Sequence, residues 1–421
     1  MRIITLSKEE FDDYAVKHEY GSYYQTSNYA NFKSKFEKYD IHYLGFKDGN
    51  ELLGAAMLVY KELFWGYKFA YAPRGFLIDY SNLSLCNEIT IGLKKLLKKQ
   101  KFIFIKLDPP IIYRKYDCEG NVEMASESSK EILKNFTKGS YVHMGFNIYN
   151  ENMLPRFYAY SKLDSNPQVL FRSFSKERQD EITLDQKKSI LVSLDKDGDI
   201  DRFLATTDSI YKGRIARHLK LLFNSFDETD DAKIFYTLID TAKYTENINK
   251  LYNEEVEVNN NLKEIIETAD SKKYNMQLVI NDKMLSDKRL AELKTNLSNS
   301  LKLIRNNPLG EVIGASLVIS SGKGVSVVAN YVDPAYKNLN ASPLTIYEIM
   351  KYYGAKGYSY IDLGSVPGDF NPKGKYYNII KGKNGFNSSI IEYIGELDLV
   401  INPFIYRFYK RKLTRGKITL K

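Results

Sequence analysis

Two short apolar stretches decide the fold of this chain: LGAAMLV at residues 53–59 and IGASLVI at residues 313–319. Each is followed by a second strand-like run, a polar break and a helix-like segment, at 85–97 in the first copy and 342–353 in the second. Each helix-like segment leads to a strand that ends in an aspartate, Asp108 or Asp362. A repeated order of elements indicates a repeated unit, so two copies of one α/β unit are predicted. Chance similarity between short apolar strings is the alternative.

A long segment between the two copies predicts a helical arm. Residues 214–307 contain no glycine or proline, which favours helices. Within this segment, apolar residues recur at three- and four-residue spacing in two runs that polar residues 270–273 separate. The runs are Ile248, Leu251, Val258, Leu262 and Ile265, then Leu290, Leu293, Leu297 and Ile304. We expect an antiparallel helical hairpin that projects from the body, with two ordinary amphipathic helices packed on the core as the alternative.

Composition and charge indicate a globular protein with surplus positive charge. The 421 residues include 61 Lys plus Arg and 52 Asp plus Glu, a formal net charge of +9. This balance suits RNA, a phosphate-bearing substrate or an anionic membrane surface, and solvated lysines explain it equally well. No apolar run is long enough to span a membrane, and Cys86 and Cys118 lie outside any CxxC or Cys/His spacing. We therefore expect a cytoplasmic protein without a metal site.

The motifs that are missing exclude several enzyme classes. HExxH, GxSxG, GxxxxGK[ST] and GxGxxG are all absent from the sequence, which argues against zinc hydrolysis, serine triads and P-loop chemistry. The repeated unit is typical of the N-acyltransferase (GNAT-like) fold, in which a bent sheet opens to hold an acyl donor. Coenzyme A would need a glycine-rich loop at a helix start, and the corresponding residues 332–340 contain no glycine. We expect no coenzyme A, and no metal or organic cofactor.

Four stretches, spread in order over the chain, resemble the Fem family of non-ribosomal peptidyltransferases, and most closely its FemA branch. They are YYQTSNYANFK from Tyr23, KFAYAPRGFLIDY from Lys68, IKLDPP around Asp108, and KGKNGFNSSIIEYIGELDLVINP from Lys381. The resemblance implies an α/β fold of two GNAT-like domains with an antiparallel coiled-coil arm inserted in the second. We expect a first domain at 1–150, a second at 151–240 and 306–395, the arm at 241–305, and a C-terminal segment at 396–421 that returns to the first domain with a basic tail.

The family resemblance also implies an activity. Fem enzymes are aminoacyltransferases that move an amino acid from aminoacyl-tRNA to the stem peptide of a lipid-linked or nucleotide-linked peptidoglycan precursor, and so build the interpeptide bridge. Aminolysis of an ester is downhill, so such an enzyme needs positioning and charge stabilisation more than an activated nucleophile. Two alternatives stay open: an immunity factor that alters the bridge against a cell-wall hydrolase, and a non-catalytic binder of RNA or precursor.

Three basic residues match positions that bind the precursor in the family or lie in its matching stretches. Lys33 follows the QTSNYANF stretch, and Arg217 lies in RHLKLLFN, so the resemblance implies that both contact the precursor's diphosphate. Arginine offers phosphate a fork and lysine a point charge. Solvated surface cations are the alternative. Arg74, in YAPRG, is a substrate-binding or a structural residue.

Three further residues carry the chemistry that the resemblance implies. Asp108 matches an aspartate near the acceptor peptide, where it would hold the attacking ammonium, although a strand-end turn explains it as well. Lys383 matches the lysine of a Phe-Lys-x-Gly-aromatic motif that stabilises the developing oxyanion. Gly382 replaces the motif's phenylalanine, and nearby Lys381 is the other candidate for this lysine.

The C-terminal tail has its own pattern. Residues 406–412 interleave bases and aromatics, as a contact with a membrane surface or RNA would. A peripheral position at the inner face of the membrane is therefore a further expectation, and a frayed, solvated terminus is the alternative.

Overall fold

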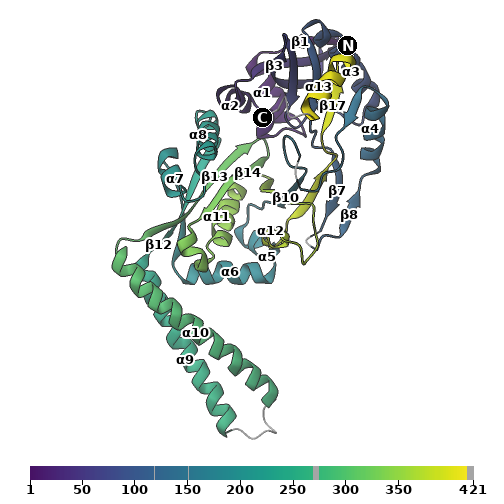
Figure 1. Ribbon diagram of the computed structural model, residues 1–421. Helices are drawn as coiled ribbons and strands as arrows, with labels where there is room; N and C mark the ends of the chain where they lie inside the picture. Colours follow the sequence, from purple (N-terminus) through teal and green to yellow (C-terminus); the bar gives the residue numbers. More distant parts are fainter. Residues whose placement is uncertain (118, 150, 269–274, 415–421) are drawn as a thin grey trace.

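The computed structural model describes residues 1–117, 119–149, 151–268 and 275–414. Two mixed β-sheets carry helices on their faces, and a pair of long helices projects from the second sheet (Figure 1). The predicted α/β class with a projecting helical arm is therefore confirmed.

Within the described residues, the first sheet contains eight strands, seven of them in the order β1-β2-β3-β4-β6-β17-β9, with β5 on β3. Neighbouring strands are antiparallel except for β4 and β6, which are parallel. The strands are β1 (Arg2–Thr5), β2 (Asp40–Asp48), β3 (Glu51–Phe64), β4 (Tyr67–Ala72), β5 (Leu77–Ile78), β6 (Phe102–Leu107), β9 (Tyr141–His143) and β17 (Leu397–Val400).

In the part of the chain that the structure describes, the second sheet contains nine strands in the order β11-β12-β13-β14-β15-β10-β16-β7-β8. Here β14 and β15 form the parallel pair. The strands are β7 (Ile112–Tyr116), β8 (Val122–Ala125), β10 (Phe157–Lys162), β11 (Ile190–Leu194), β12 (Ala232–Ile239), β13 (Glu311–Ser321), β14 (Gly324–Val332), β15 (Tyr360–Ser365) and β16 (Ser389–Tyr393).

The repeat predicted from the sequence appears as matching units in the two sheets. β3, β4, helix α3 (Leu83–Lys99) and β6 form the first copy, and β13, β14, helix α11 (Ser342–Ala355) and β15 form the second. In each copy the helix connects the two parallel strands, as a parallel pair requires a crossover. Asp108 directly follows β6, and Asp362 lies within β15.

The two halves exchange strands. β7 and β8 lie within residues 1–150 but extend the second sheet, where β7 pairs with β16. β17 lies within 396–421 and pairs with β6 and β9 of the first sheet. The expected boundary at residue 150 therefore does not follow the sheets, whereas the C-terminal segment does return to the first one.

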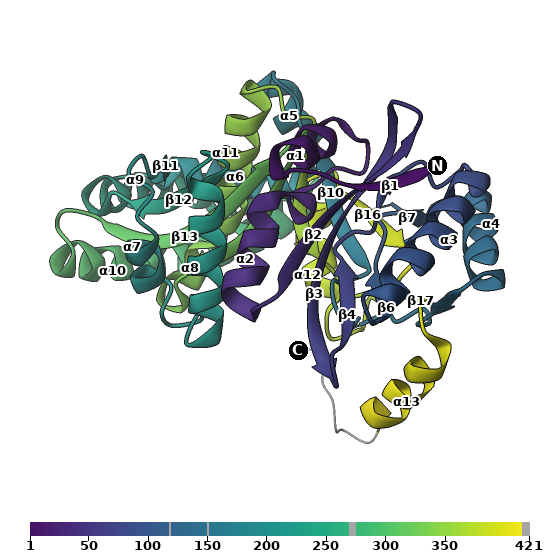
Figure 2. The ribbon, with the colours of Figure 1, turned by 90° about the horizontal axis from the view of Figure 1, so that it is seen from above.

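Helices join the halves through a shared core. α2 (Ser27–Glu37) of the first half packs beside α8 (Arg214–Asp227) of the second (Figure 2). The rings of Phe32 and His218 meet with centroids 4.8 Å apart, and those of Tyr23 and Phe226 at 5.9 Å. The other helices of the body are α1 (Lys8–Lys17), η1 (Tyr23–Gln25), α4 (Glu127–Lys138), α5 (Pro167–Ser173), α6 (Lys176–Lys187), α7 (Ile200–Thr206), η2 (Pro334–Leu339), α12 (Tyr377–Asn384) and α13 (Pro403–Thr414).

The arm consists of α9 (Thr241–Thr268) and α10 (Met276–Asn306), which pack along each other. The prediction that Val258 lies in the seam between these two helices is wrong, because its side chain is 47% exposed. Asn259 occupies the seam instead and donates hydrogen bonds from Nδ2 to Ser286 Oγ (3.0 Å) and Asp287 Oδ1 (2.9 Å). The predicted separator at 270–273 lies outside the described residues. Within the described ranges, no helix is both long and apolar enough to cross a membrane.

Candidate active site

Two open grooves lie on either side of the end of β15. The first has a volume of about 840 Å³ and is lined mainly by the second half: α6, β14, the start of α11, and α12. The second has a volume of about 580 Å³ and takes its walls from both halves, among them Tyr24 and Arg74 of the first and Tyr160, Asp362 and Tyr393 of the second. Lys383 lines the first groove and Asp362 the second.

Lys383 is held at the end of α12 against the end of β15. Its Nζ donates a hydrogen bond to the backbone oxygen of Ser365 at 2.8 Å. Burial lowers the pKa of Lys383 to about 8, and the charge of Asp362 opposes that fall. Gly364 makes the close approach feasible: its φ is +89°, and a Cβ there would lie 3.3 Å from Lys383 Nζ. The ammonium is thus aimed into a groove and is easily deprotonated for a lysine.

Lys381 lies in a different environment. Its Nζ forms an ion pair with Glu177 at 3.1 Å, and its side chain is 58% exposed. Gly382, where the family motif has phenylalanine, faces open space, since a Cβ there would meet nothing within 4 Å. The Lys381 ammonium is thus solvated and already forms an ion pair. The geometry therefore favours Lys383 over Lys381 as the lysine that acts on a reacting group.

Asp362, in β15, is the buried acidic residue that faces the second groove. Its carboxylate is 5% exposed and accepts a hydrogen bond from the Gly364 N–H at 2.7 Å through Oδ1. Burial raises the pKa of Asp362 to about 6, while the Gly364 N–H and the charges of Lys383 and Arg74 work against the rise. Two titratable groups whose pKa values are moved toward neutrality therefore face the two grooves, a pattern that marks a functional site.

Arg74 forms part of the wall of the second groove. It is 4% exposed and adopts a φ of +53°, a left-handed conformation that is uncommon for a non-glycine residue. Its guanidinium lies 4.8 Å and 4.9 Å from the ring centroids of Tyr158 and Tyr393, and Nη2 donates to the Pro155 carbonyl at 3.1 Å. A guanidinium that packs over two aromatic rings is held in place by both of them.

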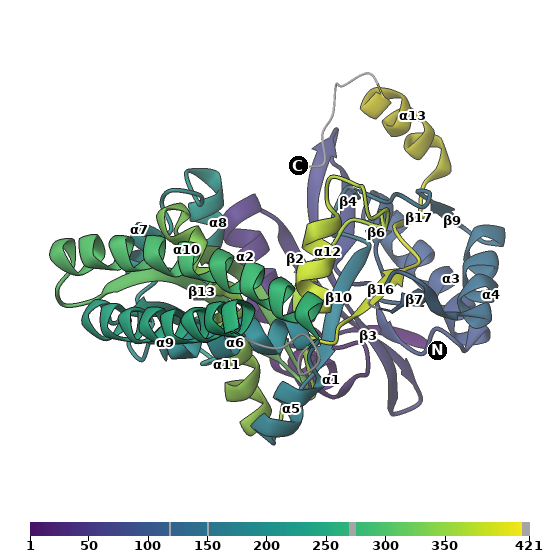
Figure 3. The same cartoon turned by 90° about the horizontal axis from the view of Figure 1, so that it is seen from below.

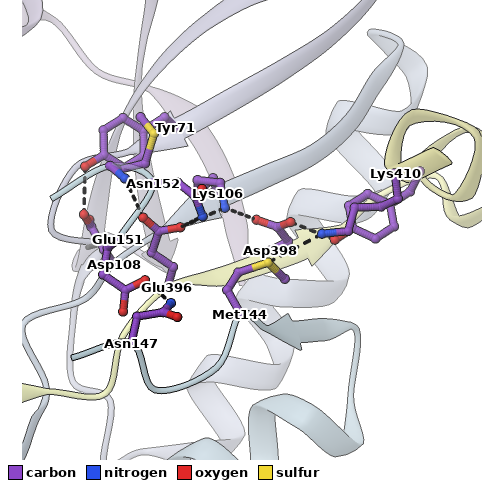
Figure 4. A network of polar contacts seen from close by, with 12 residues as sticks. Tyr71, Lys106, Asp108, Met144, Asn147, Glu151, Asn152, Glu396, Asp398 and Lys410 are labelled. Atoms are coloured by element: carbon purple, nitrogen blue, oxygen red, sulfur yellow. Dashed lines mark hydrogen bonds and ion pairs between the residues drawn. The ribbon is translucent and has the colours of Figure 1, made fainter. Parts of the chain in front are cut away.

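Asp108 lies behind Arg74 instead of in an open groove. It is 3% exposed, and its Oδ2 accepts a hydrogen bond from the Tyr71 hydroxyl at 2.8 Å (Figure 4). Its Oδ1 accepts a hydrogen bond from the Arg74 N–H at 2.7 Å. Burial raises its pKa to about 6. In the described part of the chain it lines neither groove. This placement favours a structural role for Asp108, in the turn that holds Arg74, over direct contact with an acceptor.

Lys33 and Arg217 lie on the two packed helices α2 and α8. Lys33 is 5% exposed, so the surface alternative is wrong for this residue, and its Nζ pairs with Glu37 at 2.6 Å. Burial lowers the pKa of Lys33. Arg217 is exposed, as the surface alternative supposes. The fold brings their helices together, but neither residue lines the two grooves formed by the described residues.

No three His, Cys, Asp or Glu side chains in residues 1–117, 119–149, 151–268 and 275–414 are arranged to hold a metal ion.

A family model for FemAB proteins matches residues 6–412, nearly the whole chain. The chain belongs to the FemAB family. A lipid II:glycine glycyltransferase of Staphylococcus aureus strain MSSA476 is 24% identical to it over 440 aligned residues, covering 100% of this chain and 98% of the relative. The same enzyme from strain USA300 gives the same values. The crystal structure of FemX superposes with a TM-score of 0.73 at 21% identity, over 97% of this chain and 99% of the other, which shows a shared fold.

This FemAB-family site contains residues that the sequence analysis did not assign. Asp362 was visible as the repeat partner of Asp108 but received no role. Arg178, on α6, donates from Nη2 to the Gly382 carbonyl at 2.8 Å and so fixes the turn of α12 that carries Lys383. The tyrosines of the second groove gave no signal, because nothing local in the sequence says that Tyr160 and Tyr393, whose hydroxyls lie 2.9 Å apart, meet.

Proposed function

We propose that this protein is an aminoacyltransferase that moves an amino acid from aminoacyl-tRNA to the stem peptide of a peptidoglycan precursor and so forms the interpeptide bridge. The FemAB match over residues 6–412 carries the proposal. The names of the relatives support glycine as the first amino acid to test and lipid II as the first acceptor. Its location is cytoplasmic, with a peripheral position at the inner face of the membrane, where a lipid-linked acceptor lies.

The geometry around β15 supports a transfer without a covalent enzyme intermediate. The acceptor amine must be neutral when it attacks the ester carbon, and the carbonyl oxygen then gains negative charge. Lys383, as an ammonium aimed into the first groove, would stabilise that oxygen. Asp362 faces the second groove and would hold the acceptor ammonium and take up the proton that it loses. The ester C–O bond then breaks, and the ribose oxygen of the tRNA leaves with a proton as a hydroxyl. Lys383 lines one groove and Asp362 the other, which suits two substrates that bind in separate grooves.

Turnover tests the proposal directly. Purified protein, lipid II and glycyl-tRNA should give a product that is heavier by one glycine residue in mass spectrometry, and a mixed pool of charged tRNAs identifies another donor if glycine fails. No product with any charged tRNA, together with measurable binding of tRNA or precursor, would support the non-catalytic binder. An immunity role is separated by muropeptide analysis and hydrolase sensitivity after gene disruption.

The Asp362 carboxylate should set the pH range of the reaction. Because its negative charge opposes the fall in the pKa of Lys383, Asp362→Asn should move the loss of activity at high pH to lower pH, by about one unit. Initial rates against pH measure this. Glu177→Gln is the control, since it removes a carboxylate from the first groove that pairs with Lys381 instead. An identical high-pH limb in wild type and Asp362→Asn would contradict the coupling.

Lys33 and Arg217 should clamp the precursor's phosphates. Replacing either with alanine removes a charge-assisted contact, so we expect acceptor affinity to fall about ten- to a hundred-fold, with a smaller loss at high salt. Calorimetric titration of the precursor measures the effect, and Lys35→Ala, an exposed lysine on the same helix, is the control. Since Lys33 pairs with Glu37, Glu37→Gln should not weaken binding. Unchanged affinity in both alanine variants would exclude the clamp.

A further inference from the structure

An exposed aromatic patch lies where the turn between β3 and β4 meets α13. We define the patch as Phe64, Trp65, Phe404, Phe408 and Lys412. Trp65 is 71% exposed and Phe404 is 80% exposed, although such side chains are normally covered. Trp65 is also the only tryptophan of the chain. None of the five lines either groove of the candidate active site as described above.

The patch is a built structure and not a set of loose side chains. The Trp65 and Phe408 rings stack at 5.7 Å and 23°, and Phe64 meets Phe408 edge-on at 5.7 Å. Lys412 Nζ lies 5.3 Å from the Trp65 centroid and 4.8 Å from that of Phe408. The helix and the hairpin therefore hold each other in place and present one surface.

The backbone at Trp65 is unusual. Its φ is +52° and that of Gly66 is +74°, the conformation of a tight hairpin turn that prefers asparagine or aspartate before glycine. Gly66 N–H donates to Glu62 Oε1 at 2.8 Å, which supports the turn. A bulky ring in the left-handed region is uncommon, and Trp65 stays largely exposed in spite of its contact with Phe408, which indicates a use outside the folded chain.

α13 itself has an anchored inner face and a free outer one. Tyr406 and Tyr409 are buried against Phe104, with centroids 5.4 Å and 4.9 Å away, and the Tyr406 hydroxyl donates to Asp398 at 2.7 Å. The frayed terminus considered from the sequence is therefore wrong for residues 403–414. Those residues include four bases, among them the exposed Arg407, and no acid. The patch is thus apolar at its centre and positive at its rim.

We propose that this patch docks on the surface of an anionic phospholipid bilayer. Tryptophan and phenylalanine beside bases are typical of the membrane interface, where rings enter the headgroup layer and cations attract acidic lipids. α13 lies at the opposite end of the molecule from the arm (Figure 1). Seen from below, α13 projects at the edge of the body near the end of β3 and β4 (Figure 3). RNA fits less well, since bases stack on free ring faces and one face of Trp65 is covered by Phe408.

The inference deepens the peripheral location proposed above, and its test needs no acyl transfer. Because Trp65 is the only tryptophan, its fluorescence reports docking directly. Full-length protein with vesicles of phosphatidylcholine plus phosphatidylglycerol should show a blue shift, quenching by brominated lipid, and co-flotation that salt weakens. Vesicles of phosphatidylcholine alone should bind far less. No precursor is present, so turnover and docking can fail separately.

Variants locate the contact. Phe404→Ser should lower the vesicle partition coefficient about ten- to a hundred-fold, and Arg407→Gln should lower it only for anionic vesicles. Leu309→Ser, at a fully exposed leucine elsewhere, should have no effect. The proposal would be overturned if Phe404→Ser left the partition coefficient unchanged, or if Phe404→Ser and Leu309→Ser lowered it equally. It would also be overturned if the Trp65 emission did not shift, or if the protein bound tRNA in place of vesicles. Thermal unfolding of each variant checks that the fold is intact.

Discussion

Replacing Lys383 with alanine should lower the rate of aminoacyl transfer by about two to three powers of ten while precursor binding changes little. The reason is that the Lys383 ammonium, held by the Ser365 carbonyl at 2.8 Å, would meet charge that develops only when the amine attacks the ester. Single-turnover rates with charged tRNA measure the chemical step, and titration of the precursor measures binding. A rate loss with intact binding is the pattern of a transition-state contact.

The pH dependence sharpens this prediction. Burial lowers the pKa of Lys383 to about 8, so the wild-type ammonium is present below that pH and is lost as pH rises through it. Activity should therefore fall above about pH 8. Lys383→Arg keeps its charge throughout that range, so whatever activity it retains should lack this limb.

Lys381→Ala is the matched control for Lys383→Ala, because it lies two residues away but is exposed and paired with Glu177. It should cost much less than the Lys383 variant. A near-normal rate in Lys383→Ala together with a large loss in Lys381→Ala would reverse the assignment of the two lysines.

The repeat could be predicted from sequence because its information is local. Hydrophobic pattern and helix period lie within each copy, so the stretches at 53–59 and 313–319 predict the strands that the structure contains as β3 and β13. The predicted strand-end aspartate is right for Asp108 but wrong for Asp362, because β15 continues to Ser365. By contrast, the strand exchange of β7 and β17 depends on pairing between segments far apart in the chain. Hydrophobic periodicity does not encode such pairing. The predicted domain boundary at residue 150 therefore does not account for the strand exchange.

The candidate site likewise combines features that local sequence predicts with features that depend on distant parts of the chain. Lys383 was found by its motif, but its advantage over Lys381 lies in burial and in the Ser365 carbonyl, neither of which the motif contains. The repeat aligns Asp108 with Asp362, yet Asp108 follows β6 and supports Arg74, whereas Asp362 lies within β15 and faces a groove. Which aspartate lines a groove depends on the other half of the molecule, so sequence alone could not separate them.

Replacing Lys106 with methionine should lower the free energy of unfolding by about 3–5 kcal/mol. Lys106 Nζ lies 2.8 Å from Asp398 Oδ1 and 3.1 Å from Glu396 Oε2, and all three side chains are at most 3% exposed (Figure 4). Without the cation, two buried carboxylates would lack their partner. Urea unfolding measures the loss, and Lys115→Met, which breaks an exposed ion pair with Glu123, should cost only about 0–1 kcal/mol.

The cause can be separated from simple loss of packing. Because the orphaned carboxylates of Lys106→Met can take up protons, its deficit should be smaller near about pH 5 than near about pH 8. Adding Glu396→Gln and Asp398→Asn removes both charges and should restore much of the stability. A deficit that is independent of pH and persists in the triple variant would mean that packing of the lysine stem, not its charge, matters.

Glu396 also accepts a hydrogen bond from Asn152 Nδ2 at 2.9 Å, and Asn152 lies three residues before Pro155, whose carbonyl holds Arg74. The buried ion cluster therefore supports the wall of the second groove, so the Lys106 variant should weaken acceptor binding even where it remains folded.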